Sequence, residues 1–205
     1  MVDQSESANS RTSSSLLERI KACEQDAWVR LVQLYSPLIY AWCRQFGLQA
    51  ADAADVGQEV FRAVARKISD FRRDRPGDSF RAWLRTITRN RVRDHFSALA
   101  VRAQGHGGSD AQIQLQQIPA NIETDSAVSS EADNLEAGLL YRRAMDLIRS
   151  EFEDRSWQAF WSVVVEEQSP DSVAERLGLS RNAVYLAKSR ILRRLRAEFN
   201  GLIDD

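Results

Sequence analysis

The sequence is short of the residues that build metal sites and covalent cross-links. It has two histidines and two cysteines, Cys23 and Cys43, among 205 residues. Two thiols with no histidine nearby fit no zinc pattern, and nothing indicates a disulfide framework. We therefore expect no metal ion and no cofactor, and a reducing cytoplasm is the default location.

Long apolar runs are also missing. No run approaches the roughly 18 residues that a membrane span requires, so we expect no membrane insertion. The N-terminal stretch MVDQSESANSRTSSS is polar and lacks the apolar core of a signal peptide.

Groups arranged for catalysis are absent as well. Glu166 and Glu167 are adjacent on a predicted helix and cannot face one site together, and Asp94 and His95 are adjacent in the same way. The sequence has no glycine-rich phosphate loop and no nucleophile constellation. We expect that the protein is not an enzyme and that no residue is catalytic.

Charge is strongly segregated, although the net charge is only −1. No lysine or arginine occurs between Ala103 and Tyr141. That interval holds six of the acids: Asp110, Glu123, Asp125, Glu131, Asp133 and Glu136. Basic blocks flank it on both sides, at residues 62–93 and 181–196. Segregation of this kind indicates electrostatic partners better than net charge does.

The first basic block is organised around residues 80–96, FRAWLRTITRNRVRDHF. The apolar residues that share one helical face are Phe80, Trp83, Leu84 and Ile87. A neighbouring face carries an arginine at every fourth position, here called the arginine ladder: Arg81, Arg85, Arg89 and Arg93. Like charges at this spacing repel by roughly 0.2–0.5 kcal/mol per pair, so an anionic partner is favoured. A helix lying along a nucleic-acid backbone fits this pattern, and a solvated basic face is the alternative.

Apolar periodicity predicts an all-α fold: two small helical domains joined by a flexible linker. Residues 1–15 read as a disordered Ser-rich tail and 16–100 as the first domain. Residues 101–134 read as an acidic linker rich in Gln and Gly, and 135–205 as the second domain.

Within the helical blocks, several residues are expected to begin or end helices. Pro37 is expected to start a new helix, and Gly47 to end that helix in a left-handed conformation. The candidate N-caps in the two blocks are Asp26, Asp52 and Ser156.

Residues 169–199 have the pattern of a helix-turn-helix. Ser169 and Pro170 begin one helix, Gly178 ends it, and Ser180 caps the last helix. The residues near the start of that helix that face outward are Arg181, Asn182, Tyr185, Lys188 and Ser189. Arginine can read guanine and asparagine can read adenine in the major groove. Further along, Arg190, Arg193, Arg194 and Arg196 suit phosphates, and a plain helical hairpin with a basic tail is the alternative.

The first block offers two further surfaces. The loop from Phe71 to Phe80 mixes arginines with aromatic residues, which suits stacking on unpaired bases at about 1–3 kcal/mol each. Core positions are the alternative for Phe71, Phe80 and Trp83. The face of the preceding predicted helix holds acids that would repel phosphate, so it is either solvated or a protein-docking face; it comprises Asp55, Gln58, Glu59 and Arg62.

Three motifs in order resemble the extracytoplasmic-function (ECF) sigma factors of bacterial RNA polymerase. DVGQEVFRAVARKI resembles the polymerase-clamp-binding helix of that family. SFRAWLRTITRNRVRDHF resembles its WL-x-x-I-x-x-N-x-x-x-D stretch, and SPDSVAERLGLSRNAVYLAKSRILRRL resembles its C-terminal helix-turn-helix. Departures from the family pattern occur at Gly57, Ala183, Ala187 and Lys188.

The resemblance implies a non-catalytic protein of sigma-2 and sigma-4 domains that directs bacterial core RNA polymerase to promoter DNA. Core polymerase would contact Asp55, Gln58, Glu59, Phe61 and Arg62. The minus-ten element would be bound and opened by Arg72, Arg73, Arg75, Phe80, Arg81, Arg85, Arg89, Asn90 and Arg93. The minus-thirty-five element would be read by Arg181, Asn182, Tyr185, Lys188, Ser189, Arg190 and Arg193. Anti-sigma factors are common partners in the family, and a stand-alone helix-turn-helix regulator is the alternative function.

Overall fold

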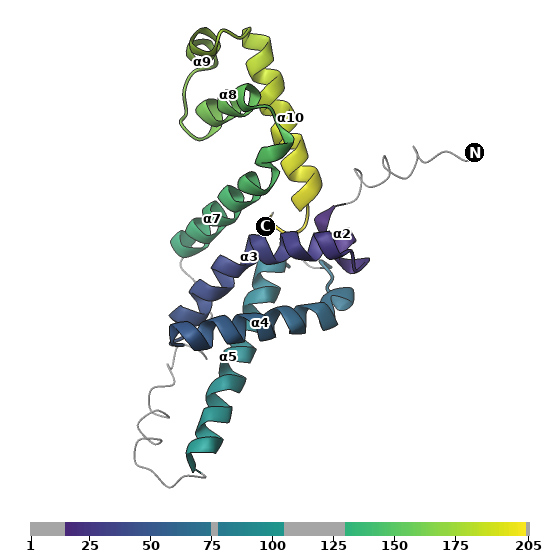
Figure 1. The fold of residues 1–205 in the computed structure, drawn as a ribbon, viewed down its shortest axis with the longest axis vertical. Helices are drawn as coiled ribbons and strands as arrows, with labels where there is room; N and C mark the ends of the chain where they lie inside the picture. The colour runs from purple at the N-terminus through teal and green to yellow at the C-terminus, as the bar shows by residue number, and fades with distance from the viewer. Residues whose placement is uncertain (1–14, 75–77, 105–129, 204–205) are drawn as a thin grey trace, which may run out of the picture.

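The computed structural model describes residues 15–74, 78–104 and 130–203, and this part of the chain contains helices and no strand. The first block comprises α2 (Leu16–Lys21), α3 (Gln25–Gln45), α4 (Ala50–Lys67) and α5 (Phe80–Gln104). The second comprises α7 (Ser130–Ile148), α8 (Asp154–Val164), α9 (Pro170–Leu177) and α10 (Arg181–Phe199). Short 3₁₀ turns follow α4 and α7, at Ile68–Asp70 and Arg149–Glu151 (Figure 1). The prediction of an all-α fold is confirmed.

The first block packs α3, α4 and α5 around a shared apolar core. Helix α4 carries a buried apolar stripe: Val56, Val60 and Val64 face inward, and Ile68 continues the stripe into the 3₁₀ turn. Phe80, Leu84 and Ile87 of α5 are buried as well. The apolar spacing of these helices thus determines which face meets the core.

The helix-turn-helix has the predicted boundaries. The Ser169 side chain accepts a hydrogen bond from the Ser172 N–H, and Pro170 is the first residue of α9. Gly178 ends α9 with a φ of 58°, and the Ser180 side chain accepts from the Ala183 N–H at the start of α10. An apolar cluster that includes Val173 and Val184 joins the two helices.

Pro37 does not begin a helix; it lies inside the continuous helix α3. Proline has no N–H, so the carbonyl of Gln33 one turn earlier loses its usual donor. Arg143 of α7 supplies a replacement, because its Nε donates to the Gln33 oxygen over 3.2 Å. The prediction failed here because a contact from the distant second block completes the hydrogen bonding. Gly47, with a φ of 92°, follows the end of α3 as expected.

The three candidate N-caps are also wrong, by two or three positions each. The N-cap residues are Glu24, Gln49 and Glu153, and none of them makes a side-chain cap hydrogen bond. Asp26 and Asp52 instead lie in the first turn, where a carboxylate is favoured by the helix dipole. A first-turn acid and an N-cap acid give similar sequence signals.

A single apolar core runs through both blocks, which the sequence did not indicate. The core includes Leu31 and Leu38 of α3 together with Ala144 of α7 and Phe199 of α10. Helix α7 lies along α3, and the end of α10 meets α2 and α3 (Figure 1). The Tyr35 hydroxyl donates to the carbonyl of Leu202, beyond the end of α10.

The predicted tail and linker lie mostly outside the described residues. Both ends of the predicted linker are helical, since α5 continues to Gln104 and α7 begins at Ser130. In the described ranges, no helix is both long enough and apolar enough to cross a membrane.

Gly57, in the middle of α4, is a position where alanine should stabilise the fold. A Cβ there would lie 3.9 Å from Ile39 Cγ2, an ordinary van der Waals contact. We expect Gly57→Ala to raise the free energy of unfolding by about 0.5–1 kcal/mol, because glycine is a poor helix former. Urea unfolding measures this; a lower midpoint would show that the site is tighter than the structure indicates.

The two thiols should differ sharply in reactivity. Cys43 is buried, and burial raises the pKa of its thiol to about 11, whereas Cys23 is exposed in the turn between α2 and α3. The thiolate is the reactive form. A disulfide reagent at pH 7.5 should therefore titrate one thiol in the native protein and both in denaturant. Rapid native reaction of two thiols would contradict the burial of Cys43.

Candidate nucleic-acid interface

The outward face at the start of α10 is exposed as predicted. Arg181, Asn182, Tyr185 and Ser189 are exposed, and Lys188 is half-buried. The inward residues Val184 and Ala187 are buried against α9. The first half of α10 thus exposes a polar face to solvent, while its apolar face packs against the rest of the second block.

Arg181 is held in place before any ligand binds. Its guanidinium donates to the Tyr185 hydroxyl over 3.4 Å, lies 5.7 Å from the centre of that ring, and pairs with Asp171 of α9 at 3.3 Å. The Tyr185 hydrogen bond and the Asp171 charge raise the pKa of Arg181. An anionic ligand would have to exchange with Asp171.

Basic residues continue along the exposed face of α10, but one arginine predicted to bind phosphate does not belong to this surface. Tyr185, Lys188, Arg193 and Arg196 line a shallow open groove, and Arg190 is exposed nearby. Arg194, expected to suit a phosphate, instead pairs with Glu151 at 2.6 Å and with Glu198 at 2.7 Å. It stabilises the fold and is not available to DNA in this conformation.

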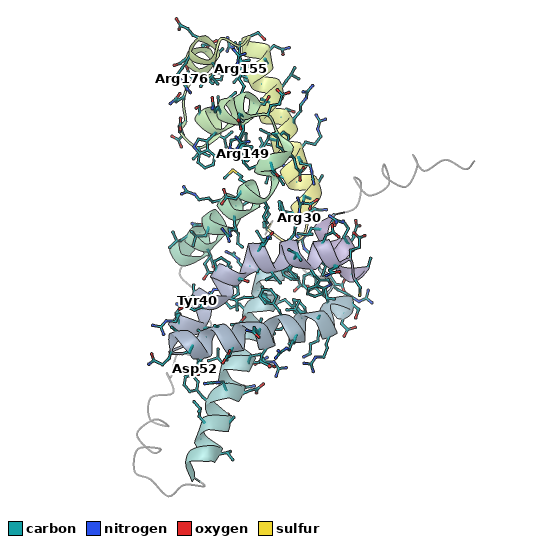
Figure 2. The ribbon with its side chains drawn as sticks, viewed as in Figure 1. Arg30, Tyr40, Asp52, Arg149, Arg155 and Arg176 are labelled. Carbon is teal, nitrogen blue, oxygen red and sulfur yellow. The ribbon has the colours of Figure 1, made fainter. Side chains whose placement is uncertain are left out.

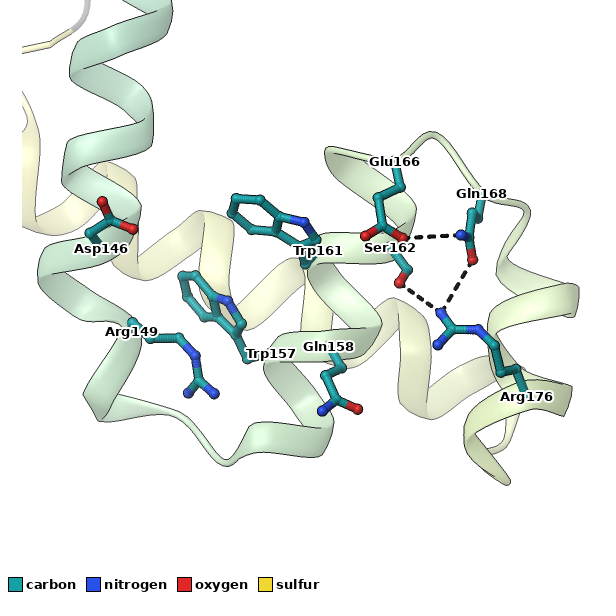
Figure 3. A pocket seen from close by; sticks show the side chains of 9 residues that line it. All are labelled: Asp146, Arg149, Trp157, Gln158, Trp161, Ser162, Glu166, Gln168 and Arg176. Atoms are coloured by element: carbon teal, nitrogen blue, oxygen red, sulfur yellow. Dashed lines mark hydrogen bonds between the residues drawn. The ribbon is translucent and has the colours of Figure 1, made fainter.

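Two arginines that the sequence reasoning missed hold the helix-turn-helix turn. Arg155 of α8 donates through Nε to the Leu177 carbonyl at 3.0 Å and through Nη2 to the Gly178 carbonyl at 2.9 Å. These carbonyls end α9 and have no intrahelical donor. Arg176 of α9 donates to Ser162 Oγ at 2.7 Å and to Gln168 at 3.2 Å, which ties α9 to α8 (Figure 3). A lone arginine in a sequence carries no signal for such a role.

Figure 3 also shows that Trp157 and Trp161 line the open pocket beside this network. The two rings stack with centroids 6.5 Å apart, and the Arg149 guanidinium lies 5.3 Å from the Trp157 centroid. Trp157 is a core residue, 7% exposed, whereas Trp161 is only partly buried and packs against the core.

The four arginines of the ladder on α5 differ in their exposure to solvent. Arg93 is exposed beside Asn90, with Nη2 and Oδ1 3.5 Å apart, and Arg89 is half-buried. Arg81 and Arg85 point to α7: their side chains are 13% and 12% exposed. Arg93 is therefore exposed to a ligand, whereas Arg81 and Arg85 are covered by the second block.

Phe80 does not belong to an exposed loop surface. It is 1% exposed, and its ring lies 5.3 Å from Phe71, 5.3 Å from Tyr35 and 5.4 Å from Trp83, centroid to centroid. Its predicted role as a base contact is not compatible with this burial, and the core alternative holds. Arg72 and Arg73 are exposed, and Arg75 lies outside the described residues.

The predicted docking face of α4 is exposed on one side of the helix. Asp55, Gln58, Glu59 and Arg62 are exposed, and Glu59 pairs with Arg62 one turn along. Phe61 is half-buried and packs on the core. The chemistry of this face is acidic and polar, which suits a protein partner and disfavours phosphate.

Comparison with known proteins shows what this chain is similar to. The model of sigma-70 region 2 matches residues 31–101. The chain is 38% identical over 89 residues to the ECF RNA polymerase sigma factor BldN of Streptomyces coelicolor, a match that covers 43% of the chain and 33% of BldN. It is 28% identical over 183 residues to the RNA polymerase sigma factor CnrH of Cupriavidus metallidurans, covering 88% of each.

The chain thus contains a sigma-70 region 2, and its relatives by sequence are RNA polymerase sigma factors. The region 2 match takes in most of α3, all of α4 and most of α5, so the α4 face and the ladder both lie within it. A stand-alone helix-turn-helix regulator is not supported. Among solved structures, the RsbN–BldN complex matches 87% of this sigma factor and 96% of that chain, at 23% identity and a TM-score of 0.35. The complex of CnrH with the cytosolic domain of CnrY matches 89% and 93%, at 26% identity and a TM-score of 0.36.

Proposed function

We propose that this sigma factor directs bacterial core RNA polymerase to promoters through three separate surfaces. The observation that supports the proposal best is the region 2 match, because residues 31–101 include both the exposed acidic face of α4 and most of the cationic helix α5. The polymerase performs the chemistry in the cytoplasm, and the sigma factor supplies the choice of promoter.

The α4 face is the proposed contact with core polymerase. Its exposed acids, Asp55 and Glu59, would repel a phosphate backbone, whereas a basic protein surface would pair with them. Phe61, half-buried at the side of the helix, would add apolar contact at the edge. Helix α4 packs mainly on α3 and α5 of its own block.

The minus-ten element is assigned to α5 and the segment before it. Arg72, Arg73, Arg93 and Asn90 are exposed, and Arg89 is half-buried. Cations at this spacing suit the backbone of a separated strand. Arg81 and Arg85 extend the same row and are covered by α7.

The minus-thirty-five element is assigned to α10. Arg181 and Asn182 at its N-terminal end would meet base edges in the major groove, with Tyr185, Lys188 and Ser189 one turn further along. Arg190 and Arg193 would contact phosphates. Arg155 and Gly178 set the angle at which α9 presents α10.

A regulatory partner of the anti-sigma class is also proposed. BldN and CnrH, both relatives by sequence, have each been solved in complex with another protein, RsbN and the cytosolic domain of CnrY. No surface of this chain is assigned to such a partner.

Substitutions at the start of α10 should change promoter choice. We expect Arg181→Ala and Asn182→Ala each to cost about 1–3 kcal/mol at particular bases of the minus-thirty-five element, because each removes a paired hydrogen bond. Transcription from a randomised promoter library with core polymerase measures the effect. Arg142→Ala, an exposed arginine of α7, controls for loss of one charge. A base preference equal to that of the unaltered protein would remove α10 from this role.

Charge reversal on α4 should separate polymerase binding from DNA binding. Glu59 has only a surface ion pair with Arg62, worth about 0–1 kcal/mol, so Glu59→Lys should leave the fold intact. We expect a loss of affinity for core polymerase of tenfold or more, about 1.4 kcal/mol, and no change in binding to a duplex minus-thirty-five fragment. Asp146→Lys on α7 is the matched reversal. If both variants bind polymerase equally well, the α4 face is only solvated.

A further inference from the structure

We propose that Leu186 of α10 is a specificity-determining residue that reads the 5-methyl group of a thymine in the minus-thirty-five element. The inference rests on the proposed function, which places α10 in the major groove. It deepens that function by giving an apolar side chain, outside the polar set at the start of the helix, a base contact of its own.

Leu186 is exposed on a helix whose other apolar residues in this stretch are buried. It is 46% exposed, whereas the nearby Val184 and Ala187 are 1% and 8% exposed and lie in the apolar cluster that joins α10 to α9. Single exposed leucines are common on protein surfaces, so exposure alone indicates no function. What distinguishes Leu186 is its position on the helix and the chemistry of its neighbours.

Leu186 lies in the row of α10 that faces away from the core. Residues spaced by three or four positions share one face of a helix. The outward row comprises Asn182, Leu186, Ser189 and Arg193, and all four are exposed. The first of them can read adenine, and the last can bind a phosphate. Leu186 therefore stands between a base-reading residue and a backbone-binding residue, where a side chain meets the floor of the groove.

The direction in which this row faces is set by two arginines beside the helix-turn-helix turn. Arg155, labelled in Figure 2, donates to the two carbonyls that end α9. Arg176, also labelled there, ties α9 to α8. Because α10 follows this turn directly, its outward row is oriented before DNA binds. Leu186 would then enter the groove together with Asn182.

Tyr185, the adjacent exposed side chain, is engaged within the protein. It is 45% exposed, but the Arg181 guanidinium lies 5.7 Å from the centre of its ring and donates to its hydroxyl over 3.4 Å. Leu186 makes no polar contact of this kind, because its side chain has no polar atom. Of the two neighbours, Leu186 is therefore the one that offers a purely apolar surface to a base.

The thymine methyl is the major-groove feature that suits this side chain. Every base pair shows donors and acceptors in the groove, and thymine adds an apolar group, its C5 methyl. Against the polar edge of another base, leucine would remove water without replacing its hydrogen bonds. Leu186 lies about 6 Å along the helix from Asn182, which is about two base-pair steps. We therefore expect the thymine within about two base pairs of the adenine that Asn182 reads.

The test removes the methyl group from the DNA and the apolar side chain from the protein. Holoenzyme assembled from core polymerase and this protein first selects its minus-thirty-five element from a randomised promoter library. Each thymine of the selected element, on either strand, is then replaced in turn by deoxyuridine, which lacks only the 5-methyl group. We expect one replacement to weaken holoenzyme binding about fourfold, roughly the effect of burying one methyl group. With Leu186→Ala holoenzyme, the same replacement should change nothing.

Three measurements separate a base contact from a loss of folding. Leu139→Ala removes a leucine of α7 that is 57% exposed and lies outside the helix-turn-helix, and it should keep the fourfold methyl effect of about one buried methyl group. Leu186→Met keeps an apolar side chain and should retain most of that effect. Leu186→Ala should unfold in urea at an unchanged midpoint or a slightly higher one, because its position is exposed and alanine is a good helix former.

The inference is overturned if deoxyuridine weakens binding equally in the unaltered protein and in Leu186→Ala, or in neither of them. A selected element that contains no thymine would overturn it as well. A protein that selects no promoter with core polymerase would contradict the proposed function itself. That failure is seen in the selection step, before any deoxyuridine is introduced.

Discussion

The packing of the two helical blocks combines a shared apolar core with one buried carboxylate. Glu198 is 3% exposed and faces arginines from three helices: Arg194 of its own helix at 2.7 Å, Arg19 of α2 at 3.6 Å, and Arg30 of α3. Burial acts to raise the pKa of Glu198, but the hydrogen bonds and charges of Arg194 and Arg30 outweigh it and hold that pKa below its usual value. Ionised Glu198 therefore stabilises the folded state at pH values above the ordinary pKa of a glutamate. This contribution is lost as the pH falls through the lowered pKa of Glu198 in the folded protein.

The position of α10 on α2 and α3 determines where α7 can lie. With the end of α10 held by Glu198 and by the Tyr35–Leu202 hydrogen bond, α7 runs along α3 and its first turns reach α5. Only then can Glu136 meet both Trp42 and Arg85. Contacts at both ends of the second block thus hold it on the first block.

Charge segregation links the fold to the function of this sigma factor. Four arginines at i, i+4 spacing repel one another, and a partner of opposite sign relieves that repulsion. In this structure two of them meet carboxylates of the same chain, while Arg93 is exposed to solvent. A promoter strand would supply the same relief with phosphates. The arginine ladder can therefore bind DNA without destabilising the fold when DNA is absent.

Local sequence predicted the elements well wherever the determining contacts were local. Ser169, Gly178 and Ser180 mark the helix-turn-helix because caps and left-handed residues act within a few positions of themselves. The apolar stripes of α4 and α10 identified their buried faces for the same reason. The prediction that Pro37 starts a new helix failed, because Arg143, more than 100 residues later, donates to the carbonyl that the proline leaves unpaired.

The sequence by itself determined that the chain is all helical, which helix faces are buried, and that its charges are sorted into opposing segments. Those properties follow from periodicity and composition, which act along the chain. Only the tertiary structure decided that Phe80 is a core residue, that Arg194 is bound to Glu151 and Glu198, and that Arg81 and Arg85 are covered. An arginine that will bind a phosphate and one that will bind a distant carboxylate look alike in sequence, because the same guanidinium serves both, and only the packing of α7 and α10 selects between them.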